Sequence, residues 1–159
     1  MRKTKYIGKL IYVTPGSGKT TIVNSNIGFY DADELMVEVM QEFEPQFIRL
    51  ENEPIQTFIR RFTDTFKYKT KINNQVLKRV QYMLDDKLTV LTGTIKIAKH
   101  ADFVFLCPIN FPGLIQRHGS QEQIEQARTE EIKFLNKNKI PFQLLNDTLE
   151  NELLRKKPK

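Results

Sequence analysis

Residues 13–21, VTPGSGKTT, match the pattern G-x-x-x-x-G-K-[ST] at every fixed position but the first, where Val13 replaces a glycine. The stretch follows the apolar run LIYV at 10–13 and precedes residues 18–25, which favour a short helix. A strand, a glycine-rich loop and a helix in this order predict a loop whose backbone N–H groups converge on phosphate oxygens. We therefore expect the chain to bind a nucleoside triphosphate.

The residue types of this loop suit ATP and Mg²⁺, which we expect as cofactors. Gly16 and Gly18 let the backbone approach the phosphates without a Cβ atom in the way. Lys19 supplies a positive charge to the β and γ phosphates, and the Thr20 hydroxyl can ligate Mg²⁺. The predicted ATP-binding residues are Pro15, Gly16, Ser17, Gly18, Lys19, Thr20 and Thr21. Val13 suits a strand end if its φ is negative; the alternative is a loop that has lost nucleotide binding.

Length and composition indicate one ordinary globular domain over residues 1–159, with 40% hydrophobic and 28% charged residues. No apolar run approaches the length of a membrane span, and the run behind the basic N-terminus is short and interrupted by Lys9. We therefore expect no membrane association and no signal peptide. Cys107 is the only cysteine of the sequence, which excludes a disulfide framework and fits the cytoplasm.

The net charge of +6 comes mostly from the tails, because residues 1–9 and 155–159 contain basic residues and no acidic one. Basic tails are more often solubilising than specific, so a nucleic-acid partner stays open but is not favoured. The internal exception is the segment 60–80, where seven basic residues stand against Asp64 alone. Arg60 and Arg61 in this segment are candidate contacts for the phosphate of an acceptor molecule.

Apolar, β-branched runs alternate with segments of helical periodicity along the chain. Strands are predicted at 7–14, 28–31, 88–91, 103–107 and 141–145. Helices are predicted at 18–25, at 33–43, at 54–70, over 76–84 after a break at Asn73-Asn74, and from Ser120 onward, where Gln123 completes a capping box. This order predicts an α/β fold with a mostly parallel five-stranded sheet and ligands at the carboxyl ends of its strands.

Asp31 and Asp33 follow the second predicted strand and therefore belong at the edge of the sheet beside the phosphate loop. One carboxylate there can hold Mg²⁺, for which we favour Asp31, or accept a proton from a hydroxyl substrate. The alternative is a helix cap in which Asp31 and Glu34 form a capping box. The third predicted strand ends in Thr92 rather than the acid that a motor ATPase uses for magnesium, so a motor ATPase is disfavoured.

Arg117 and Arg128 are the candidate cations for a transition state. Arg117 falls in a loop-rich stretch after the fourth predicted strand, and Arg128 in the helix that follows. A mobile segment that carries both would stabilise negative charge on a transferring phosphoryl group. The alternative is a solvated helix face in which Arg128 pairs with Glu125 and Glu131.

Three stretches resemble the nucleoside monophosphate kinases. Residues 13–20 resemble their phosphate loop, and LTGTIK at 91–96 resembles their L-D-G-[FY]-P-R stretch, with Thr92 in place of its Asp and Ile95 in place of its Pro. Lys96 then occupies the position of the arginine that binds the acceptor phosphate in that pattern, and Gly93 occupies the position of its glycine. Residues 103–117 and 117–128 resemble the fourth strand and the lid with its arginine pair. FYDAD at 29–33 is similar to the D-x-D of shikimate-kinase-type enzymes, in which one Asp serves magnesium and the other a hydroxyl acceptor.

The resemblance implies a P-loop kinase-type three-layer sandwich with an acceptor-binding helical segment at about 34–86 and a short lid at about 109–128. It implies an ATP-dependent kinase that acts on a (deoxy)nucleoside monophosphate. The small size and the Lys- and Asn-rich composition are similar to those of bacteriophage deoxynucleoside monophosphate kinases, which would place the protein in the host cytoplasm. The alternatives are a kinase of a small hydroxyl acceptor or of a polynucleotide 5′-hydroxyl, a non-catalytic nucleotide-binding module, and a nucleic-acid-binding protein.

Overall fold

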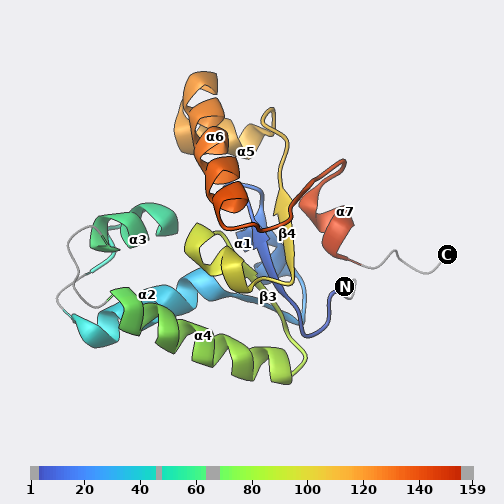
Figure 1. The fold of residues 1–159 in the computed structure, drawn as a ribbon. Helices are drawn as coiled ribbons and strands as arrows, with labels where there is room; N and C mark the ends of the chain where they lie inside the picture. Colours follow the sequence, from blue (N-terminus) through green and yellow to red (C-terminus); the bar gives the residue numbers. More distant parts are fainter. Residues whose placement is uncertain (1–3, 46–47, 64–68, 155–159) are drawn as a thin grey trace.

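Five parallel strands form the centre of the molecule in a computed structural model that describes residues 4–45, 48–63 and 69–154 (Figure 1). The strands are β1 (Leu10–Val13), β2 (Phe29–Asp31), β3 (Thr89–Thr92), β4 (Phe103–Leu106) and β5 (Gln143–Leu144). Their order in the sheet is β2-β3-β1-β4-β5, and every pairing is parallel. The predicted α/β fold with five strands is confirmed, although β1 and β5 are shorter than the predicted strands at 7–14 and 141–145.

The register of the sheet brings the ends of β1, β2 and β3 together. Tyr12 of β1 lies opposite Thr92 of β3, and Asp31 of β2 lies opposite Leu91 of β3. Three turns therefore leave the sheet at the same edge. They are the loop of residues 14–18, which the sequence predicts to bind phosphate and which we call the phosphate loop, the Asp31–Asp33 turn and the Thr92–Thr94 turn. This edge is where ligands bind in open parallel sheets.

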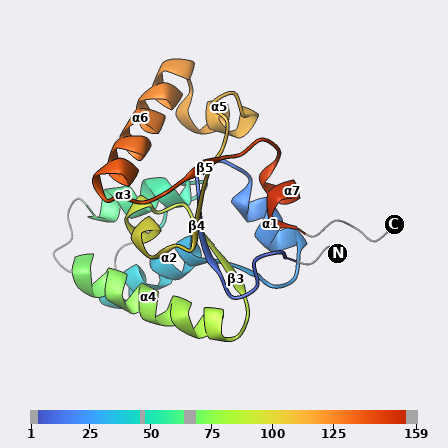
Figure 2. The ribbon, with the colours of Figure 1, turned by 45° about the vertical axis from the view of Figure 1, so that its right-hand side comes forward.

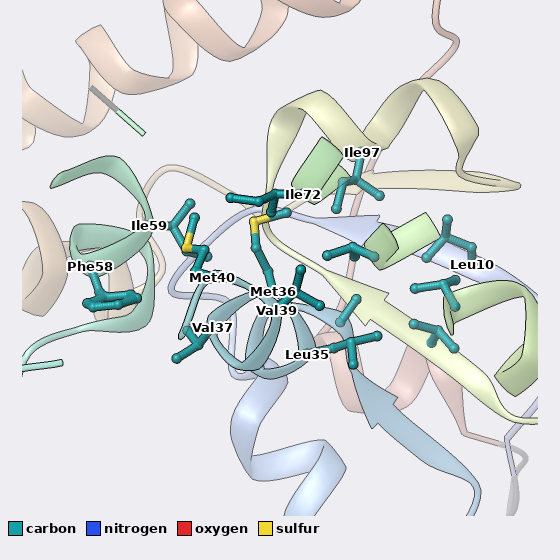
Figure 3. Packing of buried hydrophobic residues seen from close by; sticks show 14 residues of the cluster. Leu10, Leu35, Met36, Val37, Val39, Met40, Phe58, Ile59, Ile72 and Ile97 are labelled. Atoms are coloured by element: carbon teal, nitrogen blue, oxygen red, sulfur yellow. The ribbon is translucent and has the colours of Figure 1, made fainter. Parts of the chain in front are cut away.

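Helices cover both faces of the sheet, as Figures 1 and 2 show. They are α1 (Lys19–Ser25), α2 (Ala32–Phe43), α3 (Ile55–Thr63), α4 (Lys69–Asp85), α5 (Pro112–His118), α6 (Gln121–Lys137) and α7 (Leu149–Leu153), with a 3₁₀ helix η1 (Ile95–His100). Side chains of β1 alternate between the two faces. Leu10 packs with the α2, α3 and α4 side chains drawn in Figure 3, whereas Ile11 and Val13 pack with side chains of α1 and α7.

Two predicted features of the α4 region differ from the structure. Asn73 and Asn74 do not break a helix but lie inside α4, because Ile72, Val76 and Val80 bury one stripe of this helix against α2. Tertiary packing thus outweighs the modest helix propensity of asparagine. The helix predicted at 54–70 ends at Thr63 as α3, and residues 64–68 lie outside the described residues.

The segment after β5, which no predicted element covers, is partly helical. It forms the short helix α7, whose N-cap Thr148 accepts a hydrogen bond from the Asn151 N–H. Leu149 and Leu153 are buried against the face of the sheet that carries α1.

The predicted start of α6 is confirmed, since the Ser120 hydroxyl accepts from the Gln123 N–H at 3.2 Å. Within the described ranges, no helix is long and apolar enough to cross a membrane.

Replacing Leu153 by Ala tests whether α7 is part of the folded core. Leu153 is fully buried, so we expect the free energy of unfolding to fall by about 2–5 kcal/mol. Leu144→Ala is the matched control, because Leu144 is 53% exposed; we expect a change within about 0.5 kcal/mol. Urea unfolding followed by circular dichroism measures both, and equal effects of the two variants would contradict a docked α7.

Candidate functional site

The phosphate loop between β1 and α1 has the backbone that its two glycines predict. Gly16 has φ 92° and Gly18 has φ 93°, in the left-handed region that side chains disfavour. Val13 lies within β1, and it is not among the described non-glycine residues with positive φ. The substitution of the first pattern glycine by valine therefore introduces no backbone strain.

Ser17 points to a ligand for this loop. Its side chain is buried, with 4% of the residue exposed, and its Oγ has no hydrogen-bond partner among the described residues. Buried hydroxyl groups without a partner are rare in folded proteins. A cavity of about 470 Å³ adjoins the loop and is lined by Pro15, Gly16, Gly18, Lys19, Thr20 and Thr21. All but one of the predicted ATP-binding residues therefore line a single cavity, and the remaining one, Ser17, carries the unsatisfied hydroxyl.

Lys19, the first residue of α1, is held by two carboxylates. Its Nζ donates to Asp31 Oδ1 at 2.7 Å and to Asp33 Oδ2 at 2.5 Å. Burial alone would lower the pKa of the Lys19 ammonium, but the charges of Asp33 and Asp31 outweigh that effect and raise it. Lys19 is therefore firmly protonated. We call these three side chains the Lys19 triad.

Asp33 is the most completely satisfied member of the triad. It is fully buried and accepts hydrogen bonds from five groups among the described residues, at distances of 2.5 to 2.9 Å. The donors are Lys19 Nζ, Gln56 Nε2, Thr92 Oγ1, the Gly93 N–H and Thr94 Oγ1. Burial alone would raise the pKa of Asp33, but the Lys19 charge and these hydrogen bonds lower it.

Asp31 is held more loosely than Asp33. Its two hydrogen bonds with described residues, from Lys19 Nζ and from the Asp33 N–H, both use Oδ1. Burial raises the pKa of Asp31, and the Lys19 charge only partly opposes this effect. Asp31 is the N-cap of α2 as predicted, but the capping box with Glu34 is wrong, because Asp31 accepts from the Asp33 N–H instead. Its Oδ2 atom has no hydrogen bond to another described residue.

The turn after β3 carries hydrogen-bond donors to Asp33 rather than an acid of its own. Thr92 and Thr94 both donate to Asp33 Oδ1, and the Gly93 N–H donates to Oδ2. A Cβ atom at position 93 would lie 3.2 Å from Asp33 Oδ2 and 3.3 Å from Pro15 Cγ, so only glycine fits there easily. The carboxylate at this edge thus comes from Asp33, in the first turn of α2 directly after β2, and residues 92–94 supply three of its five donors.

Helix α5 lies directly on the phosphate loop. A Cβ atom at position 113 would collide with the Gly16 carbonyl oxygen, so Gly113 permits this close approach. Arg117, in the last turn of α5, places its Cδ 3.4 Å from where a Gly16 Cβ would be, and it lines the phosphate-loop cavity. We expected Arg117 in a loop; the structure places it on a helix that begins at Pro112, a favoured first residue.

Arg128 is held by protein groups at the side of the phosphate loop. It donates to the Cys107 carbonyl oxygen, and its Nε donates to Glu131 Oε1 at 3.0 Å. Glu131 in turn accepts from the Tyr12 hydroxyl at 2.6 Å. Arg128 does not line the phosphate-loop cavity. The structure contains the predicted pairing with Glu131, but the predicted solvated helix face is wrong, because the Arg128 side chain is only 13% exposed. An Arg117–Arg128 pair over one phosphoryl group stays a prediction.

A second cavity of about 370 Å³ lies beside the first, between the α2–α4 side and α6. Its apolar wall includes Met36, Met40, Ile59, Ile72 and Phe134, of which the first four are labelled in Figure 3. Its polar lining includes Gln56, Asn73, Gly93, Lys96, Arg117, His118 and Arg128. Pro15, Gln56 and Arg117 line both cavities, so the two meet at these three residues.

The predicted acceptor contacts divide into two groups. Gly93 and Lys96 line the second cavity, and their contact with an acceptor stays a prediction. Arg61 lines neither cavity and instead pairs with Glu53 at 3.0 Å, with its guanidinium over Phe58. The side chain of Arg60 lies outside the described part of the chain. Gln56, which the sequence did not single out, joins both cavities; a glutamine at a helix start carries no signal of its own.

The two residues predicted for Mg²⁺ lie differently toward the phosphate-loop cavity. Thr20 lines this cavity, whereas Asp31 lines neither cavity and Asp33 lines the phosphate-loop cavity in its place. In residues 4–45, 48–63 and 69–154, no group of three or more His, Cys, Asp or Glu residues is arranged to hold a metal. Mg²⁺ bound by one or two protein oxygens together with substrate phosphates does not need such a group. Thr20 would hold it in that way, and a role of Asp31 as metal ligand stays a prediction.

Thr92→Val tests the donors of Asp33. The change removes the Thr92 hydroxyl, which donates to the buried Asp33 carboxylate, and keeps the shape of the side chain. We therefore expect the free energy of unfolding to fall by about 1.5–3 kcal/mol. Thr129→Val is the control, because the Thr129 hydroxyl bonds a backbone carbonyl on an exposed face. Thermal unfolding compares them, and a Thr92→Val variant as stable as Thr129→Val would contradict the network.

The same variant has an expected pH dependence. The pKa of Asp33 is lowered in the folded chain, so its contribution to stability is present at neutral pH. That contribution is lost as the pH falls through the folded-state pKa. Thr92→Val weakens the lowering, so its acid unfolding should begin at a higher pH than in the wild type. An unchanged acid midpoint, measured by circular dichroism, would show that Thr92 does not act on Asp33.

Comparison with models of known protein families found no match, and no curated protein matched the sequence. The chemistry of the site therefore follows from its own residues. The site consists of a phosphate-loop cavity beside the buried Lys19 triad, and of a second cavity that meets the first at residues that include Gln56 and Arg117.

Proposed function

We propose that the chain is a small ATP-dependent kinase, built as a P-loop kinase-type sandwich, that transfers the γ-phosphoryl group to a (deoxy)nucleoside monophosphate. The observation that carries the proposal is the junction of the two cavities at Pro15, Gln56 and Arg117. Phosphoryl transfer needs donor and acceptor held in contact and in line. One cavity adjoins a phosphate loop, and the other opens next to it.

The phosphate loop supports the donor side of the proposal. Loop N–H groups, the Ser17 hydroxyl and the N-terminus of α1 present hydrogen-bond donors to an anion. Lys19 would turn from the carboxylates to the β and γ phosphates. Mg²⁺, when bound, neutralises charge that develops on the phosphate oxygens. Arg117, at the junction, would contact the transferring phosphoryl group and stabilise its charge in the same way.

The second cavity supports a nucleoside monophosphate as the acceptor. Its volume of about 370 Å³ falls in the range of about 300–1,000 Å³ that is usual for small-molecule sites. The methionine and isoleucine side chains offer an apolar wall for a base, and Lys96 and Arg117 offer cations for a phosphate. Asn73 and Gln56 offer amide groups to the base or the sugar.

The state of the two aspartates weighs against a hydroxyl acceptor. Such an acceptor needs a general base, whereas a phosphate acceptor is already a nucleophile. Asp33 accepts five hydrogen bonds and has a lowered pKa, which makes it a weak base. Asp31 keeps an oxygen without a partner among the described residues, so a shikimate- or gluconate-like acceptor remains the second candidate.

ADP release from Mg·ATP against a panel of acceptors tests the proposal. The panel holds the ribo- and deoxynucleoside monophosphates, shikimate, gluconate and a 5′-hydroxyl oligonucleotide, with Lys19→Ala as the control. We expect Lys19-dependent turnover on one monophosphate. Turnover on shikimate, gluconate or the oligonucleotide, without turnover on any monophosphate, would show that the acceptor is a hydroxyl group rather than a nucleoside monophosphate. ATP binding without turnover on the whole panel would favour a non-catalytic nucleotide-binding module.

Arg117→Ala should reduce kcat by about 10³ or more, as expected for an arginine that stabilises the transferring group. The matched control is Arg79→Ala, because Arg79 lies on α4 and pairs with Glu42 at 2.6 Å, away from both cavities. Arg128→Ala should instead lower stability, since it leaves the buried Glu131 without its cation. Steady-state kinetics and thermal melts separate the two arginines, and unchanged turnover in Arg117→Ala would remove this residue from the mechanism.

A further inference from the structure

The side-chain amide of Gln56 is fixed in one orientation by Asp33. Its Nε2 donates to Asp33 Oδ2 at 2.8 Å. Burial alone would raise the pKa of Asp33, but the Lys19 charge and the hydrogen bonds lower it, so this carboxylate is ionised and only accepts. A flipped amide would bring two oxygen atoms into contact there. The carbonyl oxygen of Gln56, Oε1, is therefore the atom that this side chain offers to a ligand.

Gln56 Oε1 is accessible at the junction of the two cavities. In the described part of the chain, Ser17 Oγ is the buried side-chain oxygen or nitrogen that lacks a hydrogen bond. Gln56 Oε1 also lacks one, so it is not sealed inside the protein. Gln56 lines both cavities. A carbonyl oxygen cannot bind an ionised phosphate, which presents acceptors, and instead requires a ligand group with an O–H or N–H.

The threonine hydroxyls that line the second cavity near Gln56 are already engaged with the protein. Thr94 Oγ1 donates to Asp33 Oδ1 at 2.9 Å and accepts from Gln56 Nε2 at 3.4 Å. Thr14 Oγ1 accepts from the Cys107 N–H at 3.1 Å. Of these neutral groups, Gln56 Oε1 is the one that is left for a ligand.

We infer that Gln56 Oε1 accepts a hydrogen bond from the 3′-hydroxyl of the acceptor nucleotide and thereby selects monophosphates that carry this group. The inference rests on the proposed function, because it takes a nucleoside monophosphate as the ligand of the second cavity. It makes Gln56 a specificity-determining residue and names the part of the ligand that this residue recognises.

The order of groups along a nucleotide assigns this hydroxyl. The phosphate has to reach the junction, which Arg117 lines. The base suits the apolar wall, which includes Met36, Met40 and Ile59 (Figure 3). Outside the phosphate itself, the 3′-hydroxyl is the hydrogen-bond donor separated from the phosphorus by the fewest bonds, and the N–H groups of the base lie at the far end. Gln56, at the junction, is therefore placed for the sugar rather than for the base.

Removing the 3′-hydroxyl from the substrate and Oε1 from the protein tests the contact. The substrates are the four 2′-deoxynucleoside 5′-monophosphates and their 2′,3′-dideoxy analogues, and the readout is the ratio of kcat/KM within each pair. Gln56→Met removes the amide and leaves Asp33 its four other donors. Gln56→Lys keeps a donor for Asp33 but has no acceptor. Melting curves check that both variants fold.

Gln81→Met is the matched control. Gln81 Nε2 donates to Asp85 Oδ1 at 2.9 Å, which is the same amide-to-carboxylate bond on the exposed side of α4. Gln81 lines neither cavity. The variant therefore loses an equivalent hydrogen bond away from the site.

The wild type and Gln81→Met should prefer the substrate with the 3′-hydroxyl by about three- to tenfold, the value of one uncharged hydrogen bond. Both Gln56 variants should lose this preference, because neither methionine nor lysine has a carbonyl oxygen. A purely structural role of Gln56 would lower kcat/KM equally for both members of a pair and leave their ratio unchanged. The ratio between ribo- and deoxynucleotides should not change in any variant.

The other outcomes separate this inference from the proposed function. Equal turnover of both members of each pair by the wild type, or a preference that both Gln56 variants keep, would overturn the contact and leave the kinase intact. A change in the ratio between ribo- and deoxynucleotides instead would also overturn it, because Gln56 would then recognise the 2′-hydroxyl. If the wild type phosphorylates no monophosphate, the proposed function fails, and calorimetric titration of the same pairs decides the contact. Absence of binding in that titration would overturn the contact as well.

Discussion

The buried contact of Lys19 with Asp31 and Asp33 is the constraint around which the site is built. It joins the phosphate loop to the β2–α2 turn, and through Asp33 it reaches α3 and the turn after β3. Buried ion pairs repay their desolvation only when further hydrogen bonds satisfy the charged atoms. The donors around Asp33 meet that condition, so four segments distant in sequence are fixed by one carboxylate.

The parallel sheet makes this convergence possible. β1, β3 and β2 are neighbours and end at one edge, so their connecting turns meet without long loops. β3 ends without an acid, and Thr92 and Thr94 instead donate to Asp33, which lies at the start of α2 directly after the adjacent strand β2. The negative charge beside the predicted phosphate loop thus lies on Asp31 and Asp33 rather than on a residue after β3.

The sequence predicted what depends on local pattern and missed what depends on packing. The glycines of the phosphate loop, the alternation of strands and helices, and the caps at Asp31 and Ser120 are local, and the structure contains them. Whether a cation faces a cavity depends on its neighbours in space. Arg61 pairs with Glu53 and lines neither cavity, and Arg128 pairs with Glu131 and lines only the second one, which no spacing rule predicts. Asn73 lies inside a helix for the same reason, because α2 covers the neighbouring stripe.

A site that neutralises its own charges also links its folding to its affinity. The Lys19 triad stabilises the chain without a ligand, and a phosphate that takes Lys19 has to replace that stabilisation before any net binding is seen. A bare loop lysine would give tighter binding to any anion, but it would leave an unpaired ammonium in a largely buried position. Asp31 and Asp33 therefore stabilise the ligand-free state at the expense of affinity for an anion.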